Sequence, residues 1–107
     1  DVEGRVCVLV DDMIDTAGTI CQAAEALMER GAKSVIAAAT HPVLSGPAAV
    51  RLNAAPFDEI IVTNTLPIAD TCKINNLTVL SIAPLIAKAI HEVFEDGSVT
   101  SLFDGQA

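Results

Sequence analysis

The sequence predicts an α/β protein whose parallel sheet is doubly wound, with helices on both faces in a three-layer α/β/α arrangement. Short β-branched apolar runs alternate with segments of helical periodicity, which indicates βαβ units and parallel strands. Of the 107 residues, 51% are hydrophobic but only 3% aromatic, so the core must be built from Val, Ile, Leu and Ala. A chain of this length forms one domain, expected over 1–107.

The first strand and helix are indicated by different periodicities. Arg5–Val10 is a nearly all-apolar run of the kind that is buried on both faces of a parallel sheet. A polar turn over 11–18 separates it from a helix over Thr19–Arg30. Apolar side chains of that helix recur at i, i+3, i+4, i+7 and i+8, and Gly31 is a natural stop just past its end.

The same alternation continues to the end of the chain. Further strands are expected at 34–40, 59–63, 77–82 and 98–103, short helices at 47–53 and 84–94, and irregular structure at 64–76. Ligands of open parallel sheets bind beyond the carboxyl ends of the strands. We therefore expect function in the segments that follow the first two strands.

The segment after the first strand combines acids with a small-residue turn. Asp11 and Asp12 follow the strand, Asp15 comes next, and the turn Thr16–Thr19 opens the helix. Unpaired N–H groups at a helix N-terminus form an anion site suited to phosphate. The stretch 6–28 contains no Lys or Arg, so we expect no side-chain cation at this phosphate. An ATP-binding P-loop is disfavoured, because that loop needs a Lys after its last Gly.

Acids and phosphate are compatible in one site if the ligand is a sugar phosphate. Carboxylates accept hydrogen bonds from vicinal hydroxyls, and they can also hold Mg²⁺. The alternative is purely structural: Asp15 or Thr16 caps the helix, and the Asp11–Asp12 pair is a solvated turn.

Residues 8–19 (VLVDDMIDTAGT) resemble the ribose-5-phosphate and PRPP motif of type I phosphoribosyltransferase folds, in the version found in ribose-phosphate pyrophosphokinases. The later segments ATH, SGPA, VTNTLP, SIAPLIA and SVTSLF are similar to that family in order and spacing. The resemblance covers essentially the whole chain and about the last third of the family's usual length. It implies a C-terminal domain, or a fragment, that lacks the N-terminal domain.

The resemblance also implies an activity and a set of roles. The full-length enzyme would transfer diphosphate from ATP to ribose 5-phosphate, giving PRPP and AMP with Mg²⁺. ATP would bind through the missing N-terminal domain, leaving this chain without catalytic residues, inactive alone, and able to bind only sugar phosphate. Asp11 and Asp12 would bind the ribose hydroxyls, with Mg²⁺ nearby. The 5-phosphate would be held by Asp15, Thr16, Ala17, Gly18 and Thr19.

Further properties of the family concern assembly and regulation. Ser98, Thr100 and Phe103 would contribute to an inhibitory nucleotide-phosphate site at a subunit interface. The full-length protein would be a cytoplasmic dimer or hexamer. Two residues depart from the family pattern: Ala17 stands where many members have Gly, and Pro42 where Gly is common.

Composition excludes several other classes of function. The net charge of −8 excludes a general electrostatic hold on nucleic acid or an anionic membrane. No apolar run approaches the ~20 residues of a membrane span. Three cysteines without CxxC spacing indicate reduced thiols rather than a disulfide framework or zinc site.

Some alternatives stay open. A phosphoribosyltransferase that uses PRPP would carry the same loop, and a catalytically silent regulatory relative would keep the same fold. A receiver domain is disfavoured, because the second and third strands end at Thr40 and Thr63 rather than at Asp or Lys. His41 is either a contact to substrate or a neighbouring subunit, or an inert loop histidine.

Overall fold

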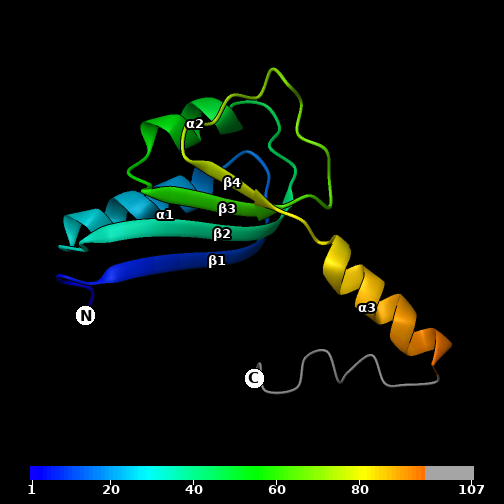
Figure 1. Ribbon diagram of the computed structural model, residues 1–107. Helices are drawn as coiled ribbons and strands as arrows, with labels where there is room; N and C mark the ends of the chain where they lie inside the picture. Colours follow the sequence, from blue (N-terminus) through cyan, green and yellow to red (C-terminus); the bar gives the residue numbers. More distant parts are fainter. Residues whose placement is uncertain (96–107) are drawn as a thin grey trace.

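The described residues form one parallel sheet whose strands follow one another in chain order. The computed structural model describes residues 1–95, so Ser98, Thr100 and Phe103 lie outside the described residues. The elements are β1 (Val6–Ile14), α1 (Gly18–Glu29), β2 (Ser34–Pro42), α2 (Ala48–Ala54), β3 (Glu59–Thr63), β4 (Leu77–Leu80) and α3 (Ala83–Phe94). The strand order is β1-β2-β3-β4, with every neighbouring pair parallel (Figure 1). The predicted α/β class and parallel sheet are confirmed.

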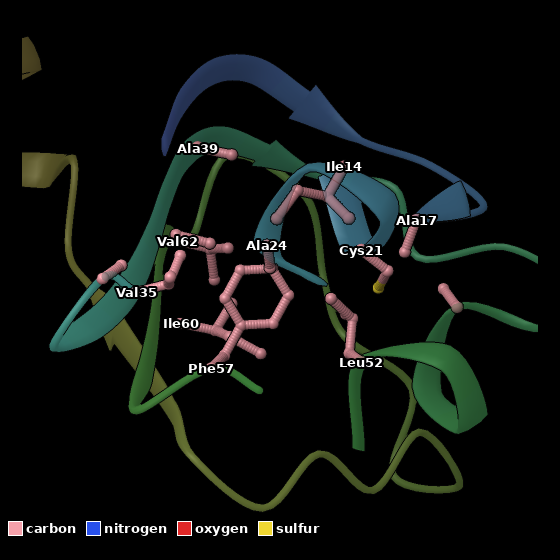
Figure 2. Close-up of a cluster of buried hydrophobic side chains, with 13 residues drawn as sticks. Ile14, Ala17, Cys21, Ala24, Val35, Ala39, Leu52, Phe57, Ile60 and Val62 are labelled. Atoms are coloured by element: carbon pink, nitrogen blue, oxygen red, sulfur yellow. The ribbon is translucent and has the colours of Figure 1, made fainter. Parts of the chain in front are cut away.

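The helices α1 and α2 cover one face of this sheet (Figure 1). Alternate strand residues point into the layer between sheet and helices, as the two-residue period of a strand requires. Figure 2 shows this core, in which small alanines allow close packing and Phe57 is the one aromatic ring that residues 1–95 contribute. Its most buried members on the strands are Val35, Ala37, Ile60 and Val62.

The connection from β3 to β4 contains no helix and is held by one side chain of α2. Asn53 donates from Nδ2 to the Lys73 carbonyl at 2.8 Å and accepts the Asn75 N–H at 2.9 Å. These bonds satisfy main-chain groups of residues 64–76 that a crossover helix would satisfy internally. All three connections between strands therefore pass on the side of the sheet that α1 and α2 cover.

The opposite face of the sheet is open among residues 1–95. Val6, Val8 and Val10 are 54%, 55% and 79% exposed, so the prediction that the first strand is buried on both faces is wrong for this part of the chain. α3 extends away from the sheet (Figure 1), and its Ile90 is 52% exposed. The described residues form two layers. The third layer and the reversal of strand order that defines a doubly wound sheet stay predictions.

The first two strands are longer than the sequence indicated. β1 continues to Ile14 and β2 to Pro42, with Asp11 paired to Ala39 and Met13 to His41. The acidic pair and His41, which were expected in loops, therefore lie in strands. The change from apolar to polar residues suggested that each strand ends earlier than it does. Hydrogen bonds between strands use main-chain groups, so two aligned strands can stay paired through polar residues.

Truncating a side chain in the covered layer should cost much more than truncating one on the open face of the sheet. Leu52→Ala removes a side chain that is 2% exposed and should lower the free energy of unfolding by about 2–5 kcal/mol. Val8→Ala, on the open face, should change it by less than about 0.5 kcal/mol. Urea denaturation followed by circular dichroism measures both variants of the chain. A loss at Val8 as large as that at Leu52 would mean that the open face is covered in solution.

Candidate functional site

A cavity of about 170 Å³ lies at the carboxyl end of β1, where the chain turns into α1. Its lining residues are Asp11, Met13, Ile14, Asp15, Thr16, Ala17, Gly18, Thr19 and Ile20. Asp12 is the one residue of the predicted sugar-phosphate set that does not line it. A second hollow of about 210 Å³ at the ends of the first three strands also includes Asp11. The predicted loop thus surrounds the first cavity, and Asp11 lines both cavities.

The main chain at the start of α1 presents donors to this cavity. Ala17 precedes the helix in the left-handed region, at φ 67° and ψ 11°, and no side chain caps the helix. The alternative that Asp15 or Thr16 acts as the cap is therefore wrong. The first N–H with an acceptor at the helix start is that of Cys21, which donates to the Ala17 carbonyl at 3.2 Å. The N–H groups before it have no acceptor within the helix and lie at its positive end.

The loop that follows β2 fixes the loop that follows β1. Ser45 donates its hydroxyl to the Asp15 carboxylate and its N–H to the Asp15 carbonyl, the second bond at 3.0 Å. The Leu44 N–H donates to the Ile14 carbonyl at 2.9 Å. Asp15 lines the cavity, but one of its carboxylate oxygens is already used to join the two loops.

Arg51 of α2 also contacts this turn. Its Nη1 donates to the Thr16 carbonyl at 3.2 Å. A Cβ built on Gly18 would lie 2.9 Å from that nitrogen. The sequence gives no sign of this cation, because Arg51 is 35 residues from Thr16. The guanidinium contacts a carbonyl and does not line the 170 Å³ cavity.

Cys21 lies in the first turn of α1 and has an altered acidity. Burial, followed by the nearby carboxylate of Glu25, raises the pKa of this thiol, while Arg51 opposes the rise. A raised pKa keeps the thiol protonated and poorly nucleophilic near neutral pH. Cys7, Cys21 and Cys72 are all free.

His41 is held at the carboxyl edge of the sheet, outside the cavity. Its Nδ1 lies 2.8 Å from the hydroxyl of Thr65, and that hydroxyl is 3.2 Å from the Thr40 carbonyl, to which it donates. Thr63 donates to the same carbonyl at 2.7 Å. These bonds join the end of β2 to the segment after β3, so His41 has a structural contact where the sequence left two interpretations open.

The acidic pair is solvent-exposed at the end of β1. The N–H of Asp12 donates to Oδ1 of Asp11 at 2.7 Å. Within residues 1–95, no group of three or more His, Cys, Asp or Glu side chains is close enough to hold a metal ion. Mg²⁺ keeps several waters and needs only one or two carboxylates when substrate phosphates supply the other ligands. None of the helices described is long and apolar enough to span a bilayer.

Residues 1–104 match the protein family described as phosphoribosyl synthetase-associated domain. The chain belongs to this family. It is 65% identical over 106 residues to a ribose-phosphate pyrophosphokinase of Streptomyces coelicolor, and the match covers 99% of this chain and 33% of that protein. It is 62% identical over 107 residues to the ribose-phosphate pyrophosphokinase of Mycobacterium tuberculosis, with 100% and 33% covered. The chain thus spans about a third of the length of these relatives.

A solved structure extends the similarity to three dimensions. The crystal structure of phosphoribosylpyrophosphate synthetase from Mycobacterium smegmatis superposes with a TM-score of 0.86 at 59% identity, over 91% of this chain and 33% of that one. The resemblance to ribose-phosphate pyrophosphokinases drawn from residues 8–19 and the later segments is confirmed at the level of the family.

Because Ala17 has a left-handed conformation, replacing it with glycine should affect stability differently from the same replacement at Ala24, which lies within α1. Ala17→Gly and Ala24→Gly each remove one methyl group, from sites that are 6% and 0% exposed. Gly relieves a cost of roughly 1–2 kcal/mol at a left-handed position, but within a helix it costs about 1 kcal/mol. Ala24→Gly should therefore destabilise the chain by at least about 1 kcal/mol more than Ala17→Gly in thermal or urea unfolding. Equal losses would show that Ala17 is not strained.

Proposed function

We propose that this chain is the ribose-5-phosphate-binding domain of a ribose-phosphate pyrophosphokinase, located at the C-terminal end of the whole enzyme. That enzyme would transfer the β,γ-diphosphoryl group of ATP to the anomeric hydroxyl of ribose 5-phosphate, giving PRPP and AMP. The observation that carries the proposal is the cavity at the end of β1, which is lined both by Asp11 and by the residues at the start of α1. The names of the relatives support the choice of reaction.

The two parts of the ligand would make different contacts, the phosphate with main-chain N–H groups and the ribose with a carboxylate. The 5-phosphate would accept hydrogen bonds from main-chain N–H groups at the start of α1, where the helix dipole favours an anion. A ribose hydroxyl would donate to Asp11, which lies on the strand side of the same cavity. Asp15 would act by holding the turn, since Ser45 already uses one of its oxygens. Asp12, next to the cavity, would contact the sugar or the metal only from its rim.

Diphosphoryl transfer also needs positive charge, because the moving group is strongly anionic. Mg²⁺, held by Asp11 and Asp12 through oxygen or water, would neutralise part of that charge. The chain itself carries a net charge of −8. The proposal therefore places ATP and the catalytic basic side chains on the other two thirds of the enzyme. It also places there the second helical layer of a doubly wound sheet. Assembly into dimers or hexamers and a cytoplasmic location are parts of the same proposal.

Amide NMR of the chain provides a direct binding test. Ribose 5-phosphate should shift the amide signals of Ala17, Gly18 and Thr19, because their N–H groups would bond to the phosphate. Ribose without phosphate serves as the control and should leave them unchanged. Shifts confined to residues far from the cavity would contradict this placement of the phosphate.

The two acids should differ in a full-length enzyme that contains this domain. Asp11→Asn removes a charged acceptor from the cavity and should cost about 2–4 kcal/mol in kcat/KM for ribose 5-phosphate, or roughly 30- to 1000-fold. Asp12→Asn should cost less, since Asp12 does not line the cavity. Steady-state kinetics with varied ribose 5-phosphate measures both. Wild-type kinetics for Asp11→Asn would remove that residue from the site.

The isolated chain should bind without catalysis. With ATP, Mg²⁺ and ribose 5-phosphate it should produce no AMP, because an acid-lined cavity in a chain of net charge −8 opposes a diphosphate. A coupled assay for AMP measures turnover, with full-length enzyme as the positive control. Turnover by the chain, free of contaminating enzyme, would place catalytic groups within it. An inactive full-length protein that still binds ribose 5-phosphate would favour the silent regulatory relative.

A further inference from the structure

We propose that Arg51 is a positioning residue for the phosphate loop, defined here as residues 15–19. From α2, its guanidinium holds the Thr16 carbonyl and so sets the direction of the next N–H. The inference rests on the proposed function of the cavity at the end of β1. It adds a residue that touches neither the phosphate nor the sugar and acts through the main chain of the loop.

The first step is the orientation of one peptide group. In a trans peptide the carbonyl and the following N–H point in opposite directions. Arg51 Nη1 donates to the Thr16 carbonyl at 3.2 Å, and Arg51 lines a separate hollow of about 270 Å³ between α1 and α2. The Ala17 N–H is thereby directed away from Arg51, and Thr16 and Ala17 both line the candidate cavity.

The second step is that this orientation needs support. Ala17 has a φ of 67°, which a residue with a Cβ adopts only at a cost, and no side chain caps α1. A different orientation of the Thr16–Ala17 peptide would relieve that cost and turn the donor away from the ligand. A hydrogen bond from a charged donor is of the stronger kind, so Arg51 opposes that rearrangement.

The third step is an independent observation at Gly18. Gly18 does not have a positive φ, so its backbone conformation does not require glycine. A Cβ on Gly18 would instead lie 2.9 Å from Nη1 and 3.7 Å from Cζ of Arg51, so a side chain at this position would displace the guanidinium. Because Gly18 has no side chain, the Arg51 guanidinium has room to reach the Thr16 carbonyl.

The test uses the full-length enzyme that contains this domain. Arg51→Gln should raise the KM for ribose 5-phosphate by roughly 10- to 100-fold, as expected for a misplaced binding group, with the KM for ATP changed less than about two-fold. Arg51→Lys should recover part of the loss, because its ammonium retains the charge but not the forked geometry. Arg30→Gln, at the other end of α1, loses the same charge and should behave as wild type.

A double-mutant cycle separates positioning from general damage. Gly18→Ala should raise the KM for ribose 5-phosphate in the presence of Arg51, because the methyl group displaces the guanidinium. In an Arg51→Ala background the same substitution should add less than about two-fold, because the methyl group then has space. Melting temperatures measured in parallel identify any unfolded variant, and Gly18→Ala tests the contact even if an Arg51 variant does not fold.

The outcomes distinguish this inference from the function on which it rests. Wild-type kinetics for Arg51→Gln, or a Gly18→Ala effect that persists in full without Arg51, would overturn the role of Arg51. If Asp11→Asn still weakens ribose 5-phosphate binding in that case, the proposed function stands. Loss of both effects would overturn the proposed function together with the inference.

Discussion

The parallel pairing of β1 with β2 is the interaction on which the rest of this structure depends. It runs from Val6 opposite Ser34 to Ile14 opposite Pro42, well beyond the apolar part of either strand. Because the two strands end together, the loops that follow them also lie together. Ser45 can then bond to Asp15, and α2 begins close enough to α1 for Arg51 to reach Thr16. The candidate site is thus a consequence of how far the two strands remain paired.

Small side chains make this arrangement possible on the covered face. Ala24 of α1 and Ala37 of β2 are fully buried, and Ala48 at the start of α2 is as well. Larger residues at these positions would move the helices away from the sheet, and the loops with them. In the site itself, Gly18 also leaves room for a neighbour, because one extra carbon there would meet the Arg51 guanidinium. Small residues that leave room for a neighbouring group are the constraint shared by the core and the candidate site.

The sequence predicted what depends on local pattern. Apolar runs and helical periodicity located the described elements to within a few residues, and the Thr16–Thr19 turn located the cavity. The errors came from interactions between distant segments. Asp11 and His41 read as loop residues because their polarity gives no sign of the ladder that continues through them. Arg51 lies in another helix, and nothing near Thr16 in sequence indicates its approach. The exposure of Val8 depends on which elements lie over it, which an apolar run does not specify.

The open valine face has a consequence for how copies of this chain behave toward one another. β1 is an edge of the described sheet, and an apolar edge strand offers a template for association with another strand. The net charge of −8 opposes such contacts through repulsion between copies. That repulsion reaches about 10 Å at 0.1 M salt but only about 3 Å at 1 M. We therefore expect concentrated salt to weaken the repulsion that opposes contact between the exposed valines of two copies.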